Sequence, residues 1–243
     1  MAILSRDQIF VRLNLPITNS RSFAVTPLLQ AKSVFDAEAL DLRLGTHFLL
    51  PRVPPQAYFF PGAESSKLGH QRAHIPLGSY LVVPAHQTVL GMTLEFIKLP
   101  HDVSGQILTK SSVARTFVVI ETAPWIHPEY RGCLTLEIAN VSNTALLLYP
   151  GKLVAQLILF DVPDGRPADQ QSPTYMGPVY PEAPKFSDPA HDLKTIGVDN
   201  EMRTPDVKRP PAQRCPECLN KVCAGAIEFP VCCMVCHCEL AAS

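Results

Sequence analysis

The sequence predicts a mainly β protein, either a distorted barrel or a jelly-roll-like sandwich. From about residue 39 the apolar runs are short and rich in β-branched residues. Turn residues interrupt them at intervals of roughly 8 to 12 residues, as in barrels and sandwiches. No long helical segments alternate with these runs, which argues against a doubly wound α/β fold. The 243 residues suffice for one such domain and an appendage.

A short helix is expected before the strands. Ser5 and Gln8 match the S-x-x-Q capping box, which satisfies free backbone N–H groups at a helix start. Ile9, Phe10 and Leu13 then fall on one apolar face. Proline disfavours helix at the residue before it, so we expect the helix to stop near Pro16.

The expected strands follow in order along the chain. Their sequences are "LDLRLG", "THFLLPRV", "GSYLVVPAHQTVLG", "TLEFIKLP", "GQILTK", "FVVIETA", "CLTLEIAN", "ALLLYPG" and "KLVAQLILFDV". These runs complete a first domain over residues 1–162. Residues 163–213 hold ten of the 24 prolines and little periodicity, which predicts a linker or wrapping arm. The aromatic stretch "PTYMGPVYPEAPKF" favours docking of part of that arm.

Residues 214–243 form a Cys-rich module, since seven of the eight cysteines lie between positions 215 and 238. Two C-x2-C pairs separated by 14 residues match a zinc ribbon, in which four thiolates surround a structural Zn²⁺. The expected ligands are Cys215, Cys218, Cys233 and Cys236. A shifted register or a second metal is left open by Cys223, Cys232, His237 and Cys238. Free cysteines and a redox disulfide are the alternatives, and a protein partner or oligomer contact is the expected role.

Charge and hydropathy narrow the class of protein. The formal net charge is −1, so no bulk attraction to nucleic acid or membrane is expected. No run reaches the roughly 18 to 20 apolar residues of a membrane span, and "MAILSRDQIF" has no apolar signal region. Between residues 201 and 243, five basic residues balance five acidic ones, which weakens a nucleic-acid role for the tail. We therefore expect a soluble cytoplasmic protein.

The stretch "TKSSVAR" gathers two serine hydroxyls, an ammonium group and a guanidinium group before an apolar strand. Such a turn can donate hydrogen bonds and positive charge to phosphate oxygens; an exposed polar loop is the alternative. In the strand "LTLEIAN", alternation places Thr135, Glu137 and Ala139 on one face and the three larger apolar residues on the other. In a cleft, desolvation would raise the pKa of Glu137 to a value suited to proton transfer; on an outer face Glu137 would be solvated.

The order of "ILSRDQI", "ALDLRLGTHF", "KSSVAR", "TAPWIHPEYRGCLTLEIAN" and "LYPGKLVAQLILF" closely resembles dCTP deaminases of the dUTPase-like fold, including bifunctional dCTP deaminase/dUTPases. The resemblance spans about residues 1 to 186. It implies a homotrimer with active sites at subunit interfaces. It also implies hydrolysis of dCTP to dUTP and ammonia. The alternatives are a dUTPase or bifunctional enzyme that gives dUMP and pyrophosphate, and a nucleotide-binding regulator that has lost its chemistry.

By this resemblance the catalytic residues are Ser111, Arg115, Ala123 and Glu137. Glu137 would be general base and acid for a water attacking the cytosine C4, ordered by Ser111 and Arg115. Mg²⁺ would accompany the triphosphate, and the arm, to about residue 187, would close over the nucleotide. The expected nucleotide contacts are Lys110, Ser112, Val113, Ala114, Trp125, His127, Thr135, Leu136, Tyr175, its rival Tyr180, and Lys185.

Two positions depart from the family pattern. Lys110 stands where Arg is common, which keeps the charge but loses a bidentate donor. His127 stands where the family usually has Asp, which would contact the deoxyribose and, in dUTPases, help to activate water. Hydrolysis of dUTP is therefore less expected than deamination. Trp125 resembles the bifunctional members and favours the opposite conclusion, although it could also be a packing residue.

Overall fold

The computed structural model describes residues 2–29, 35–36, 38–51, 69–120, 123–162 and 177–185, together with four two-residue strands between positions 213 and 240. The chain divides into two compact units. The first comprises Met1–Pro51 and His70–Lys185, and the second comprises Arg52–Gly69 and Phe186–Ser243. Both described helices, the strands between residues 24 and 161 and the candidate site belong to the first unit.

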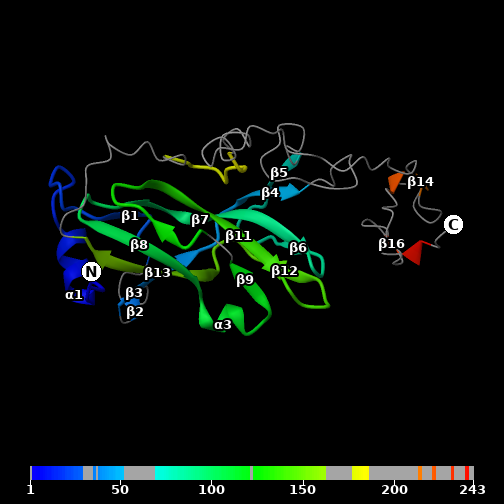
Figure 1. Ribbon diagram of the computed structural model, residues 1–243, viewed down its shortest axis with the longest axis horizontal. Helices are drawn as coiled ribbons and strands as arrows, with labels where there is room; N and C mark the ends of the chain where they lie inside the picture. The colour runs from blue at the N-terminus through cyan, green and yellow to red at the C-terminus, as the bar shows by residue number, and fades with distance from the viewer. Residues whose placement is uncertain are drawn as a thin grey trace, which may run out of the picture. The chain divides into compact units, whose positions relative to one another are not determined.

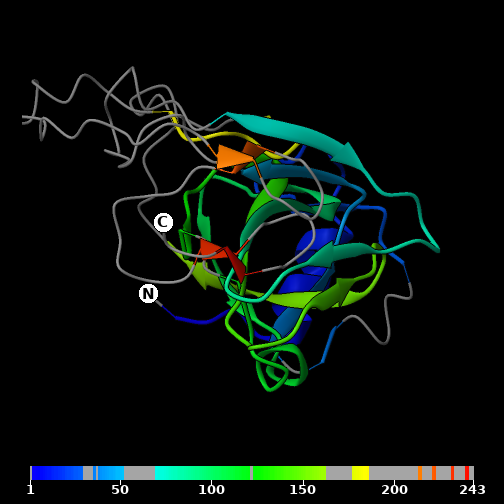
Figure 2. The ribbon, with the colours of Figure 1, turned by 90° about the vertical axis from the view of Figure 1, so that its right-hand side faces the viewer.

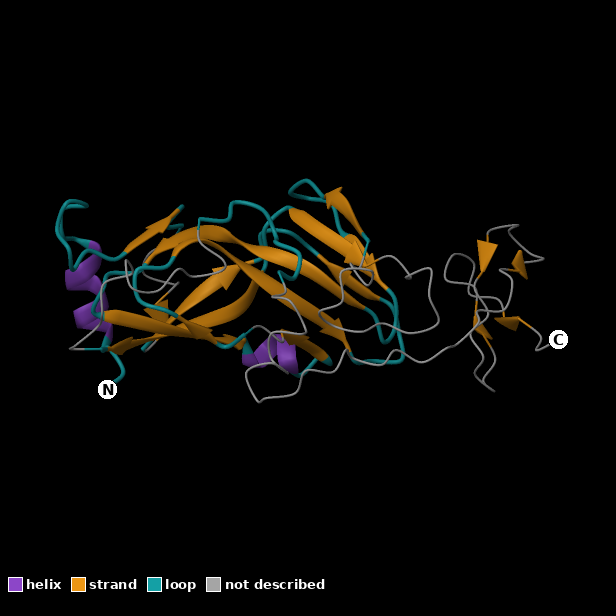
Figure 3. Ribbon diagram, turned by 45° about the horizontal axis from the view of Figure 1, so that its top comes forward, coloured by secondary structure: helices purple, strands orange, loops and turns teal. Residues whose placement is uncertain are grey.

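The first unit contains two large antiparallel sheets and a smaller one, which confirms the predicted mainly β class (Figures 1 and 3). One sheet has the strand order β5 (His70–His74), β4 (His47–Pro51), β7 (Thr88–Lys98), β11 (Arg131–Asn140) and β9 (Val118–Ile120), with β1 (Ala24–Thr26) also paired to β7. The other has the order β10 (Trp125–Ile126), β8 (Val103–Thr109), β13 (Leu153–Asp161), β3 (Ala39–Arg43) and β2 (Phe35–Asp36). A smaller sheet joins β12 (Leu146–Leu148) to β6 (Leu81–Val83).

The core holds the apolar residues that alternation assigns to the inner faces of the strands. Leu136 on β11 and Leu157 on β13 are completely buried. The apolar runs do not predict β5, because its sequence HQRAH lacks apolar alternation. It is an edge strand with no buried residue, where polar side chains are tolerated.

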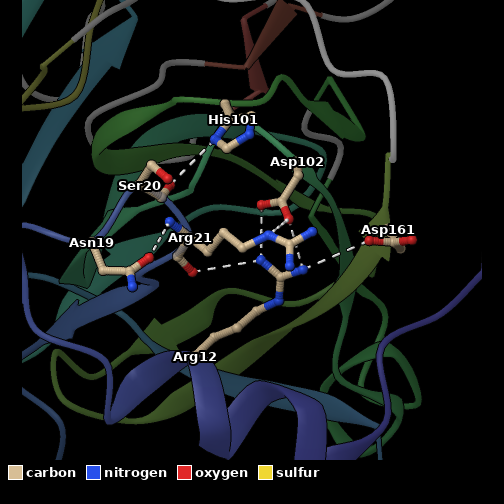
Figure 4. Close-up of polar contacts among 7 residues, drawn as sticks. All are labelled: Arg12, Asn19, Ser20, Arg21, His101, Asp102 and Asp161. Carbon is tan, nitrogen blue, oxygen red and sulfur yellow. Dashed lines mark hydrogen bonds and ion pairs between the residues drawn. The ribbon is translucent and has the colours of Figure 1, made fainter.

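Helix α1 (Arg6–Leu13) begins at the predicted capping box, in which Ser5 and Gln8 exchange hydrogen bonds. Ile9 is fully buried, whereas Phe10 is 37% exposed, so the predicted apolar face packs only in part. The helix is held to the sheets by a two-pronged ion pair from Arg12 to the buried Asp102, with nitrogen–oxygen distances of 2.8 and 2.9 Å (Figure 4). Arg21 adds a contact to the same carboxylate at 3.1 Å.

In the second unit the structure describes two short antiparallel strand pairs. Gln213–Arg214 (β14) pairs with Lys221–Val222 (β15), and Val231–Cys232 (β16) pairs with Glu239–Leu240 (β17). Along the sequence, each pair brackets one of the two C-x2-C motifs. The four expected zinc ligands, Cys215, Cys218, Cys233 and Cys236, lie outside the described residues.

Candidate functional site

The turn that the sequence singles out begins where β8 ends. Helix α3 (Ser111–Ala114) is a single turn with Lys110 at its N-cap, followed by Arg115. Ser111, Ser112, Ala114 and Arg115 are exposed, and Val113 packs against the core. The serine hydroxyls and the guanidinium group are therefore accessible in this chain, and the Val113 side chain attaches the turn to the core.

The chain then crosses from one sheet to the other and back. After α3, β9 pairs with the end of β11 through Val118, Val119 and Ile120. Thr109 ties the two sheets at this point, because its Oγ1 accepts a hydrogen bond from the Ile120 N–H at 2.9 Å. Strand β10 afterwards returns to β8, with Trp125 opposite Gln106. This crossing places the α3 turn against β9, which pairs with the last residues of β11.

Glu137 lies on β11, one residue before the segment that pairs with β9. It is opposite Leu90 of β7, and its side chain is exposed. Leu136 and Ile138 point into the core, as the alternation predicts. Thr135 is half-buried, but Ala139, placed on the Glu137 face, is buried. Within this single chain Glu137 therefore lies on an outer face, and burial by its own chain does not desolvate it.

The other expected contacts around the crossing are also at the surface. Ala123 is exposed at the entry to β10. Trp125 is 40% exposed and lies against Phe160, with ring centroids 5.7 Å apart, so it has a packing contact as well as an accessible face. His127 is exposed, and its carbonyl accepts a hydrogen bond from the Tyr130 N–H.

Residues 177–185 of the predicted arm lie along the free edge of β11. The Gly177 N–H donates to the Arg131 carbonyl and the Cys133 N–H donates to the Pro178 carbonyl, both at 2.7 Å. The Glu182 N–H reaches Thr135 Oγ1 at 3.2 Å. The arm and β9 thus occupy successive parts of the same strand edge, on either side of Glu137. Residues 177–182 of the arm are therefore hydrogen-bonded to β11 within this chain.

The arm, drawn in yellow in Figure 2, also contacts β4 through one aromatic side chain. The Tyr180 ring meets the His47 ring edge-on, with centroids 4.8 Å apart. Burial, and then the neighbouring His74, lowers the pKa of His47. Lys185 pairs with Glu182 at 2.8 Å. Tyr175 lies outside the described residues.

Lys110 has a partner that the sequence analysis does not identify. Its Nζ binds Oδ2 of Asp41 on β3, and Gln156 on β13 donates to the other carboxylate oxygen at 3.0 Å. Asp41 is 3% exposed. The sequence contains one indication of this pairing, an acidic residue in the middle of the apolar strand sequence "LDLRL". A carboxylate that is buried in such a strand requires a partner.

The residues that the structure describes contain neither a metal-binding cluster nor a membrane-spanning helix. Within those residues, no group of three or more His, Cys, Asp or Glu could hold a metal ion. Among the described helices, none is long and apolar enough to cross a membrane.

Comparisons with known proteins place this arrangement in context. A family model described as dCTP deaminase-like matches residues 16–162. The chain is 28% identical to a "dCTP deaminase, dUMP-forming" of Dictyoglomus turgidum over 58% of this chain and 73% of that protein. It is 33% identical to the protein of the same name from Corynebacterium diphtheriae, over 52% and 70% of the two chains.

Among solved structures, the chain is similar to a 2'-deoxycytidine 5'-triphosphate deaminase from Agrobacterium tumefaciens. The sequence identity is 19% and the TM-score is 0.49, over 65% of this chain and 47% of that chain.

Proposed function

This chain belongs to the dCTP deaminase-like family, and we propose that it hydrolyses the exocyclic amino group of dCTP. The observation that supports this proposal is the crossing between the sheets. It links a turn with two serine hydroxyls and a guanidinium group to β9, which pairs with the end of the strand that presents a carboxylate. Those are the groups that hydrolytic deamination requires: a proton carrier, and donors that hold water and phosphate.

In the proposed reaction Glu137 takes a proton from a water as the water oxygen bonds to C4 of the cytosine. Glu137 then delivers a proton to the amino nitrogen, the C4–N bond breaks, and ammonia leaves. The remaining proton of the added water passes to N3 of the ring, and the water oxygen becomes the C4 carbonyl of uracil. Ser111 and Arg115 hold the water and Glu137. Ala123 and Trp125 line the pocket for the cytosine. His127, Thr135 and Leu136 contact the nucleoside.

A carboxylate that shuttles protons at neutral pH needs partial desolvation. Glu137 is exposed in the single chain, so another surface must supply that burial. We propose a homotrimer in which a neighbouring copy covers the outer face of β11. Light scattering coupled to size exclusion measures this directly, and a monomer that turns over dCTP would contradict it.

The triphosphate is proposed to lie on the α3 turn, against Ser112 and the backbone of Val113 and Ala114, with Mg²⁺ entering as part of the substrate. The arm would complete the site through Lys185 and either Tyr175 or Tyr180. Since Tyr180 and Lys185 already have partners within the arm and on β4, their contribution to phosphate binding requires a rearrangement of those side chains.

The direct test is ammonia release from dCTP and Mg²⁺ by the purified full chain. Glu137→Gln keeps the size of the side chain and removes the proton carrier, so it should reduce turnover at least ~100-fold, in the range of general acid–base catalysis. Glu38→Gln changes an exposed glutamate in the turn before β3 and should leave turnover unchanged. Absence of turnover of dCTP or any related cytosine nucleotide by the unmodified chain would refute the proposal.

The product is a separate question. The names of the two relatives favour dUMP formation, whereas a His at position 127 favours a product that stops at dUTP. Chromatography distinguishes dUMP with pyrophosphate from dUTP. Tight binding of dCTP without turnover, undiminished by Glu137→Gln, would instead indicate the nucleotide-binding regulator.

For the Cys-rich module we propose one structural Zn²⁺ held by Cys215, Cys218, Cys233 and Cys236, with protein contact or oligomer stabilisation as its role. The order of strand pairs and C-x2-C motifs along the chain supports this proposal. Metal analysis should find about one zinc per chain for a four-thiolate site. A Cys215→Ser/Cys218→Ser variant that retains full zinc content would contradict the assignment.

A further inference from the structure

The Lys110 side chain is held inward, toward the sheet that contains β3. Its Nζ contacts the Asp41 carboxylate, and the Lys110 side chain is only 24% exposed. The Asp41 side chain is 4% exposed. The pair is neutral overall, so it brings no net positive charge to a phosphate at the turn.

Asp41 depends on Lys110 for its charge compensation. Its other oxygen accepts one hydrogen bond from Gln156, which lies directly opposite Asp41 in the β3–β13 register. A neutral amide does not balance a carboxylate. Leaving a buried carboxylate without its cation costs more than one additional phosphate contact returns. The ammonium group is therefore more stable on Asp41 than on a ligand.

The backbone of Lys110 is tied at the same place. Its N–H donates to the Val154 carbonyl at 3.0 Å, and its carbonyl accepts from Val113 and Ala114 at 2.8 and 2.9 Å. Lys110 is thus the residue at which the α3 turn joins β13 and β3. Side chain and backbone together determine where the hydroxyl groups of the turn lie.

We propose that Lys110 and Asp41 form a positioning pair that anchors the α3 turn, and that the Lys110 side chain is not a phosphate ligand. This inference rests on the proposed nucleotide site and replaces the role that the resemblance implies for Lys110. The phosphates are then held at the turn by the Ser112 hydroxyl and by the backbone of Val113 and Ala114. The pair acts on the nucleotide only through the position of Ser111 and its neighbours.

A double-mutant cycle tests the pair, with dCTP affinity measured by calorimetry and stability by denaturant unfolding of the full chain. Lys110→Met leaves Asp41 buried with an uncompensated charge, so dCTP affinity should fall about tenfold and the unfolding midpoint should drop. Adding Asp41→Asn removes the stranded charge and keeps an acceptor for Gln156. The double variant should recover affinity to within about threefold of the unmodified chain, because coupling within such a pair is large.

A phosphate ligand would behave differently. If the double variant regains stability but dCTP affinity stays low, Lys110 contacts the triphosphate and the inference is wrong. Unchanged affinity in Lys110→Met would also overturn it. If Lys110→Met does not fold, recovery of both folding and affinity in the double variant supports the pair, whereas low affinity there overturns it.

The matched control is Arg12→Met, which removes the main cation of the equally buried Asp102 beside α1 (Figure 4). It should lower the unfolding midpoint without changing dCTP affinity. A loss of affinity in this variant would mean that general destabilisation explains the Lys110 result, and the inference would fall. If the unmodified chain binds dCTP without turning it over, the deaminase proposal is wrong, but the double-mutant cycle still tests the Lys110–Asp41 pair.

Discussion

Gly132→Ala should release the arm from β11. Gly132 has a φ of +147°, and a Cβ added there would lie 2.5 Å from Pro178 Cδ and 3.0 Å from the Pro178 nitrogen. Real Cβ atoms do not approach other heavy atoms to 2.5 Å, and Pro178 is part of the docked arm, so the arm must move. The hydrogen bonds at Gly177 and Cys133 flank this contact and would be lost with it.

The expected cost combines two terms. A non-glycine residue in such a sparsely populated backbone region costs about 1–3 kcal/mol. Two lost backbone hydrogen bonds add about 1–3 kcal/mol, at 0.5–1.5 kcal/mol each. Because moving the arm relieves part of the backbone strain, the terms are not fully additive, and we expect the free energy of unfolding to fall by about 2–4 kcal/mol.

Denaturant unfolding measures the stability change, and limited trypsin digestion at Lys185 reports release of the arm. Gly78→Ala is the matched control, since Gly78 also has a positive φ, +89°, but a Cβ there would meet no heavy atom within 4 Å. Gly78→Ala should lower the free energy of unfolding by the cost of the positive φ alone, and it should leave the protection of Lys185 from trypsin unchanged. Equal protection of Lys185 in Gly132→Ala and the unmodified chain would refute the steric reasoning.

Three further outcomes are expected. Burial alone would raise the pKa of Asp102, but the hydrogen bonds and charge of Arg12 outweigh burial and hold that pKa below 3.8. The resulting stabilisation is complete above the pKa of Asp102 in the unfolded chain, and it is lost as the pH falls through the lower pKa of Asp102 in the folded chain. Unfolding midpoints measured in acid should therefore vary less with pH in Arg12→Met than in the unmodified chain. Burial, and then Glu95, raises the pKa of Cys133 to about 11. Mass spectrometry after iodoacetamide treatment at neutral pH should therefore find Cys133 unmodified in the native chain and modified in denaturant; modification of native Cys133 at the denatured rate would contradict this. His127→Asp should increase the share of dUMP among the products of dCTP, and an unchanged product ratio would show that position 127 does not set the outcome.

The local features of the chain were predictable because they depend on neighbours in the sequence. The capping box at Ser5 and Gln8 determines the start of α1, and a period of two residues places Leu136 and Ile138 in the core. The polar composition of residues 110–115 likewise indicates an exposed turn after β8. Each of these inferences uses residues only a few positions apart.

The sequence did not predict features that depend on long-range register and burial. Lys110 and Asp41 are 69 positions apart, and they meet only because β3, β13 and β8 are adjacent in one sheet. The edge of β11 accepts the arm near Arg131 because β9 pairs only with its last three residues. Alternation gave two possible environments for Glu137, and the structure selects the exposed one for a single chain.

By itself the sequence determined the class of fold, the chemistry of the turn and the strand, and their resemblance to a family. These follow from side-chain type and short-range periodicity. Only the tertiary structure decided that the ammonium of Lys110 is bound to Asp41 and that Ser111, Arg115 and Glu137 lie at the surface of the chain. The reason is that charge pairing depends on distance and burial in three dimensions, which residue order alone does not contain.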